Sequence, residues 1–185
     1  MKEHKALGAA IVACICFAAA GASLLAGMIR YHGWGSFPAL AAVFLIIAGL
    51  LCPSTLLLSA GALIRAVLSL YAAMETLLLF FNNMPHPALL LRTLLTLCAS
   101  VLLLSLCFSG RRSVLLGWLS GGFMMLSALV NFSGWRVPAL NWQPQTADLV
   151  SILLNIAAIL GPILAGYARR EMTEFRSAWR NLFRK

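Results

Sequence analysis

Two charged residues of opposite sign stand inside long apolar stretches, and they are the first candidates for chemistry. Glu75 precedes Asn82 by seven residues and Arg92 follows Pro87 by five, so they lie on the two arms of one hairpin. At about 1.5 Å of rise per helical residue, their depths below the turn differ by only about 3 Å. An ionisable group inside a membrane helix is costly and by default marks a functional site. We therefore expect Glu75 and Arg92 to form an ion pair.

This pair has two interpretations. It is either a structural staple between two helices, or the floor of a polar site that binds a zwitterionic or charged solute or exchanges a proton. A buried ion pair says little about stability, because desolvation can cancel the attraction. The site interpretation predicts that Glu75→Gln or Arg92→Met abolishes ligand binding or uptake in a folded protein. Full recovery in the charge-swapped double variant would instead indicate a staple.

More polar side chains are expected at the same level. Asp148, Ser151 and Asn155 stand at i, i+3 and i+7, which places them on one helix face, and Asn131 ends the preceding apolar run. Asp148 equally fits a helix N-cap. The candidate ligand-binding residues are Glu75, Arg92, Asn131, Trp135, Trp142, Asp148 and Asn155.

Motifs for catalysis and cofactors are absent. The five cysteines form no CxxC pair, the three histidines are scattered, and neither HExxH nor GxSxG occurs. We therefore expect no metal, no cofactor and no catalytic residue. A lipid-modifying enzyme that uses Glu75, Asp148 and His86 is the least favoured alternative, because nothing fixes their geometry.

The composition excludes most soluble proteins. Hydrophobic residues make up 62% and charged residues 10% of 185 residues, against about 45–50% and about 25% in soluble domains. This excludes a soluble enzyme, a nucleic-acid-binding domain and a disordered tail. We expect an all-α, polytopic integral membrane bundle.

About six transmembrane helices are expected, since each crossing needs about 20 mostly apolar residues. The predicted spans cover 6–29, 37–81 as two spans, 88–108, 113–131 and 148–168. The turn within 37–81 lies either at Cys52-Pro53-Ser54 or at Ser59-Ala60-Gly61. The first position buries Arg65 near mid-membrane, and the second leaves it near the cytoplasmic surface.

The cations predict the orientation. With both termini in the cytoplasm, ten of the 14 Lys and Arg residues lie inside and only Arg30 and Arg136 lie in outer loops, as the positive-inside rule requires. Residues 1–168 then form the transmembrane domain of a multi-pass protein of the cell (inner) membrane. Residues 169–185 form a basic amphipathic helix that binds anionic lipid headgroups, or alternatively a cytoplasmic partner.

Small residues recur every fourth position, for example at Gly117 and Gly121 and at Ala157, Gly161 and Ala165, which indicates close helix packing. In overall shape the predicted protein is similar to the substrate-binding subunits of energy-coupling-factor vitamin transporters. Small six-span stress-response membrane proteins have a similar outline. We expect a solute-binding or transport subunit with a site open to the outside. The alternative is a non-catalytic accessory or assembly subunit that binds a membrane protein partner.

Overall fold

The computed structural model describes residues 2–31, 36–82, 87–107, 111–132 and 149–170. These residues form six α-helices and one short 3-10 helix, without a strand among them, which confirms the all-α prediction. The elements are α1 (Lys2–Tyr31), α2 (Phe37–Leu51), α3 (Thr55–Phe81), α4 (Pro87–Leu103), η2 (Leu104–Cys107), α5 (Arg111–Phe132) and α6 (Leu149–Arg170).

The helices suit a lipid environment. Helices α1, α3, α5 and α6 are long and apolar enough to cross a membrane. Helix α2 has 15 residues and α4 has 17, so they are shorter than the roughly 20 residues of a full span, although η2 continues α4 directly. Large apolar side chains such as Ile15, Leu56 and Phe81 are more than half exposed. A soluble protein rarely exposes so much apolar surface, and the structure therefore supports a membrane helical bundle.

The turn between α2 and α3 lies at Pro53. The Cys52 amide donates to the Ala48 carbonyl at 2.7 Å, and the Ser54 hydroxyl caps α3 by accepting from the Leu57 amide at 3.4 Å. Of the two sequence-based alternatives, the first is therefore correct. Arg65 then lies ten residues into α3, about 15 Å from the helix start and near the middle of a hydrocarbon layer of about 30 Å.

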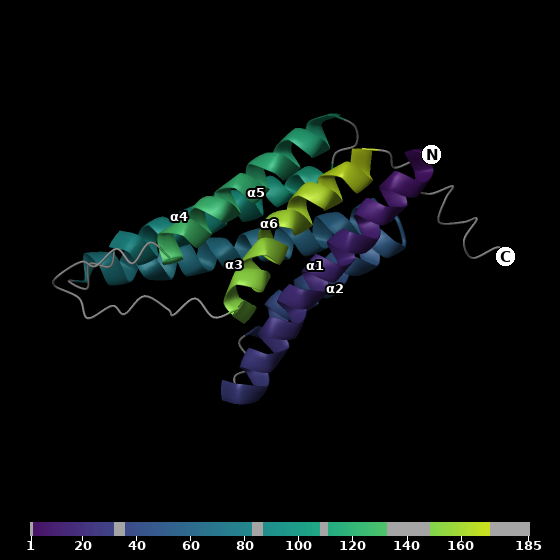
Figure 1. Cartoon of the computed structure of the whole chain (residues 1–185). Coiled ribbons are helices and arrows are strands. Elements are labelled where there is room, and N and C mark those ends of the chain that lie inside the picture. Colours follow the sequence, from purple (N-terminus) through teal and green to yellow (C-terminus); the bar gives the residue numbers. More distant parts are fainter. Residues whose placement is uncertain (1, 32–35, 83–86, 108–110, 133–148, 171–185) are drawn as a thin grey trace.

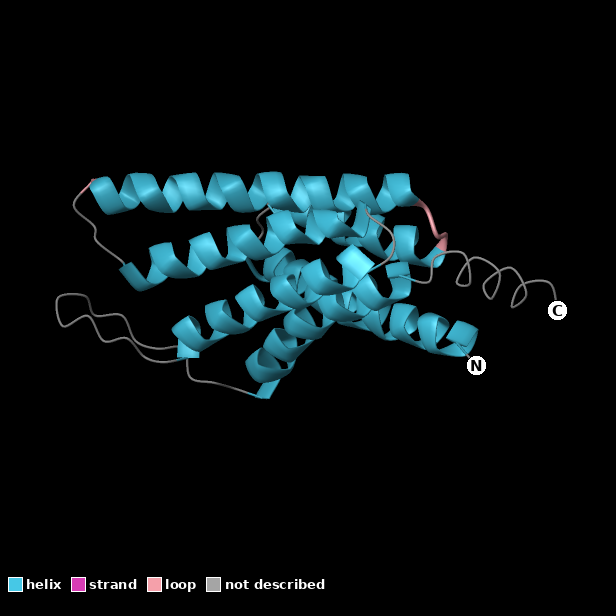
Figure 2. Ribbon diagram, turned by 90° about the horizontal axis from the view of Figure 1, so that it is seen from above, coloured by secondary structure: helices cyan, strands magenta, loops and turns pink. Residues whose placement is uncertain are grey.

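The six helices form a ring. Each helix packs against the next one along the chain, and α6 returns to pack against α1. We call the end where α1 begins and α6 ends the terminal end, and the opposite end the loop end. Figures 1 and 2 show the helices close together toward the terminal end, while α1 and α2 diverge from α3 and α4 toward the loop end.

An apolar core closes the terminal half of the ring. It contains Ala13, Phe17, Val43, Ile46, Leu50, Leu58, Ala62, Leu103, Leu106 and Ala165. The short helix η2 contacts α3, α4, α5 and α6, and the fully buried Leu106 belongs to it. The centre of the bundle is therefore filled with side chains at this end.

Arg169 requires a correction to the predicted tail. Helix α6 continues to Arg170, and Arg169 is only 2% exposed. Its Nε donates a 2.7 Å hydrogen bond to the Leu106 carbonyl. Arg169 is thus part of the bundle rather than of a lipid-facing segment, and residues 171–185 of the predicted amphipathic helix lie outside the described residues.

The small-residue pattern is explained by helix contact. A Cβ on Gly117 would lie 2.8 Å from the Pro162 carbonyl oxygen, and one on Gly166 would lie 2.5 Å from the Ser113 carbonyl oxygen. The Ser113 hydroxyl also donates to the Gly166 carbonyl at 3.0 Å. The glycines therefore let the backbones of α5 and α6 touch, as expected for helices that associate in lipid.

Candidate functional site

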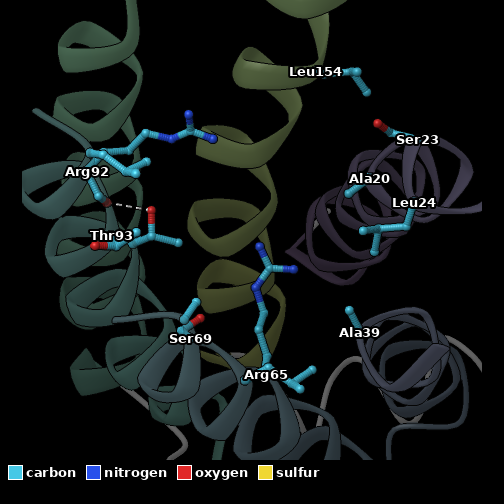
Figure 3. Close-up of a pocket in the computed structure, with 13 residues that line it drawn as sticks. Ala20, Ser23, Leu24, Ala39, Arg65, Ser69, Arg92, Thr93 and Leu154 are labelled. Atoms are coloured by element: carbon cyan, nitrogen blue, oxygen red, sulfur yellow. Dashed lines mark hydrogen bonds between the residues drawn. The ribbon is translucent and has the colours of Figure 1, made fainter. Parts of the chain in front are cut away.

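A cavity of about 450 Å³ lies between the diverging helices. Residues from α1, α2, α3, α4 and α6 line it, and they belong to the half of the bundle nearer the loop end. Figure 3 shows its wall, with residues of α1 and α2 on one side, residues of α4 on the other and residues of α3 below. The apolar core of the terminal half lies beyond its deep end.

Arg65 forms the floor of this cavity. Its side chain rises from α3 and its guanidinium group points into the space (Figure 3). Among the described residues, no side chain or carbonyl pairs or hydrogen-bonds with this group. Arg65 also borders a second void of about 20 Å³ that reaches Ser100, Ser120 and Pro162, which is room for about one water molecule. A cation therefore stands deep in the bundle without a counter-ion in the described part of the chain.

Arg92 reaches the same cavity from α4. Arg92 is exposed and lies five residues after the start of α4, about 8 Å along that helix. Its guanidinium points into the space that Arg65 enters from below (Figure 3). No acidic residue occurs among the described residues of the lining. The described lining therefore holds two cationic side chains and no anionic one.

The hydroxyl groups in the lining are mostly committed to the protein. Thr93 donates to the Leu90 carbonyl at 2.9 Å, and Thr96 donates to the Arg92 carbonyl at 2.9 Å, the dashed line in Figure 3. Ser69 shares a 2.8 Å hydrogen bond with Ser100. A hydroxyl has a single proton to donate. Most of the uncommitted donor capacity in the described lining therefore belongs to the Arg65 guanidinium group.

Glu75 lies away from this site. It is exposed on α3 and is not among the residues that line the cavity. Within the described residues, no ion pair joins it to Arg92. It follows Arg65 by ten residues, which at about 100° per residue turns it roughly 80° away around α3. The similar depths of Glu75 and Arg92 were not enough to predict an ion pair, because depth along the helices does not give the direction in which each side chain points.

The other predicted ligand-binding residues do not join the lining either. Asn155 is partly buried on α6, and its Nδ2 donates to the Ser151 carbonyl at 2.7 Å. Asn131 lies in the last turn of α5, but its side chain is outside the description, as are Trp135, Trp142 and Asp148. The described residues also contain no group of three His, Cys, Asp or Glu side chains that could hold a metal.

The sequence contained one usable signal for Arg65. Pro53 stops the preceding helix and Ser54 caps the next one, so this adjacent pair predicts where α3 begins. The start of α3 in turn sets the depth of Arg65 in the bundle. The serine and threonine residues of the lining carried no comparable signal, because such residues are common in helices that contact other helices.

Comparison with known proteins adds no assignment. No protein-family model, no curated protein and no solved structure matches the chain.

Proposed function

We propose that the protein is a membrane-embedded solute-binding or transport protein, and that its site is the cavity above Arg65. The solute is an anion. This differs from the site built on Glu75 and Arg92 that the sequence suggested, because Arg65 replaces Glu75 as its central residue. Arg92 belongs to both.

The observation that carries the proposal is the Arg65 guanidinium group. It lines the cavity, and none of the described residues neutralises it. An arginine at the centre of a membrane helix costs about 2.5–3.5 kcal/mol on insertion scales. Such residues occur where they face a cavity and serve a function. An anion bound at Arg65 would offset this cost with charge-assisted hydrogen bonds.

The shape of the bundle supports transport over simple binding. Transporters hold their substrate near the middle of the bilayer, in a site open to one side at a time. Here the cavity lies at the diverging loop end, and the apolar core with η2 fills the terminal end. Among the described residues, this matches a carrier in a state that is closed at the terminal end.

The test is ligand-dependent stabilisation of the purified protein in a neutral detergent. A ligand that binds only the folded state at 100 times its Kd stabilises it by about 2.7 kcal/mol. Matched panels of organic anions, cations and neutral solutes are compared by their effect on Tm. We expect stabilisation by anions alone, lost in Arg65→Met and retained in Arg112→Met, since Arg112 is exposed on α5 and does not line the cavity.

Two results would contradict the proposal. One is stabilisation by cations or neutral solutes to the same extent, and the other is an anion effect that survives in a folded Arg65→Met variant. An anion that passes the test is then loaded into proteoliposomes, where counterflow that depends on Arg65 distinguishes a transporter from a binding protein.

The accessory-subunit alternative has one observation in its favour. Glu75 is exposed beside the exposed apolar residues Tyr71, Met74 and Leu78. A carboxylate on a lipid-facing surface is costly, and contact with a second membrane protein would remove the cost. Mild purification without crosslinking tests this, because a stoichiometric partner lost in Glu75→Gln is expected only if the accessory role is correct.

A further inference from the structure

We infer that the ligand of the cavity is an amphipathic anion, with one acid group on an apolar body. This rests on the proposed function and narrows it, since inorganic anions, sugar phosphates and nucleotides are also anions. The acid group binds at Arg65, and the apolar body lies along the walls between Arg65 and the loop end.

The first argument is the number of hydrogen bonds that the cavity can offer. Of the four hydroxyl groups in the described lining, those of Thr93 and Thr96 donate to backbone carbonyls, Ser69 shares one bond with Ser100, and Ser23 is the single one left to donate to a ligand. A sugar or nucleotide carries many hydroxyl and amide groups, and each one left unsatisfied after burial costs affinity. A ligand with one acid group requires only the Arg65 guanidinium group.

The second argument is the chemistry of the walls. Leu24, Leu68, Leu89 and Leu154 come from four different helices and face the cavity, together with Ala39 and Ala72. These side chains gain nothing from a small hydrated ion. They favour an apolar body, at about 0.8 kcal/mol for each buried methylene, or about fourfold in affinity.

The third argument is size. A volume of about 450 Å³ is many times the space that one water molecule needs and lies within the roughly 300–1,000 Å³ of small-molecule sites. Phosphate or acetate would leave most of this space unfilled, whereas a medium-chain carboxylate would fill a large part of it. Arg65 is at the floor of the cavity and Arg92 is close to the loop end. The acid group at Arg65 therefore lies at the deep end, and the apolar body extends from it toward the loop end.

The experiment measures binding of a carboxylate series to the full-length protein in phosphatidylcholine nanodiscs, with protein-free nanodiscs as the blank. The probes are acetate, hexanoate and decanoate, with decanol and decyltrimethylammonium as matched uncharged and cationic controls, and inorganic phosphate. We expect decanoate to bind most tightly, hexanoate less, and acetate and phosphate not at all. Neither decanol nor the cation should compete with decanoate.

Two variants separate the acid group from the apolar body. Arg65→Met should weaken hexanoate and decanoate alike, by about tenfold or more. Ala39→Phe fills part of the wall and should weaken decanoate more than hexanoate. Arg65→Lys, which keeps the charge, should retain part of the affinity and shows that the loss is not caused by misfolding.

The outcomes distinguish this inference from the proposed function. If phosphate or acetate binds as tightly as decanoate and depends on Arg65, the anion site stands and the amphipathic ligand is wrong. If unlabelled decanol displaces decanoate as effectively as unlabelled decanoate does, and Arg65→Met has no effect, then both the inference and the proposed anion site are wrong. Tighter binding of a sugar phosphate than of decanoate would also overturn the inference.

The same acid and apolar body can come from a soluble acid or from a bilayer lipid. Nanodiscs with and without phosphatidylglycerol distinguish these sources. If the anionic lipid displaces decanoate, the source is the bilayer, and if it does not, the source is a soluble acid. Either result is consistent with the inference, which depends on the chain-length series and on Arg65.

Discussion

The Nε of Arg169 donates a 2.7 Å hydrogen bond to the carbonyl oxygen of Leu106, which lies 63 residues earlier in the chain. This bond connects the last turn of α6 to η2, the short helix that closes the terminal end of the bundle. It is the point at which the proposed closed end of the cavity is attached to a long helix.

Replacing Arg169 with methionine is therefore expected to loosen the terminal end. A hydrogen bond to a charged group contributes about 1.5–3 kcal/mol, so Tm should fall by several degrees. Hydrogen exchange should increase in residues 104–107 before it increases elsewhere. Arg112→Met, at an exposed arginine, is the control, and an equal loss of Tm in both variants would contradict a specific role for the Arg169 bond.

The contact between α5 and α6 makes a second prediction. Gly166→Val should be strongly destabilising, because its Cβ alone would lie 2.5 Å from the Ser113 carbonyl oxygen. Overpacking of this kind costs about 1–3 kcal/mol or more. Gly122→Val on α5 is the matched control, since nothing lies within 4 Å of a Cβ there. Thermal unfolding in detergent checks both, and equal Tm values for the two variants would show that the helices do not approach as closely as described.

Glu75→Gln should leave anion binding unchanged. Glu75 is exposed and outside the cavity lining, so removal of its charge does not alter the groups that contact a ligand. The measurement is the decanoate Kd of Glu75→Gln beside that of Arg65→Met, both in folded protein. A loss of binding in Glu75→Gln at unchanged Tm would restore the site that the sequence first suggested.

The native cysteines offer a test of orientation. Cys52 is exposed in the turn between α2 and α3 at the terminal end, whereas Cys98 is exposed in the middle of α4. In a Cys107→Ser background, a membrane-impermeant maleimide should label Cys52 only after the cytoplasmic face is opened, if both termini are cytoplasmic. Cys98, facing lipid, should stay unlabelled, and labelling of Cys52 from outside intact cells would reverse the predicted topology.

The sequence alone determined that the protein is an all-helical bundle rich in lipid-compatible surface. Apolar runs of sufficient length, interrupted by proline and asparagine, specify helices by local physics, since each helix satisfies its own backbone hydrogen bonds in lipid. The packing role of Gly117 was also predictable, because small residues at fixed spacing have one main use between helices. The position of Arg65 needed only a decision between two turns.

The proposed site was decided by the tertiary structure. Sequence spacing along a hairpin gives depth but not direction, so Glu75 and Arg92 looked like partners although α3 turns Glu75 away from the cavity. Arg65, Ser23 and Leu154 share a cavity because three distant helices meet around it, and no local pattern encodes that meeting. The burial of Arg169 was likewise decided by tertiary packing. Its position beside a basic tail predicts a solvent-exposed side chain, but α6 packs against η2 and encloses it.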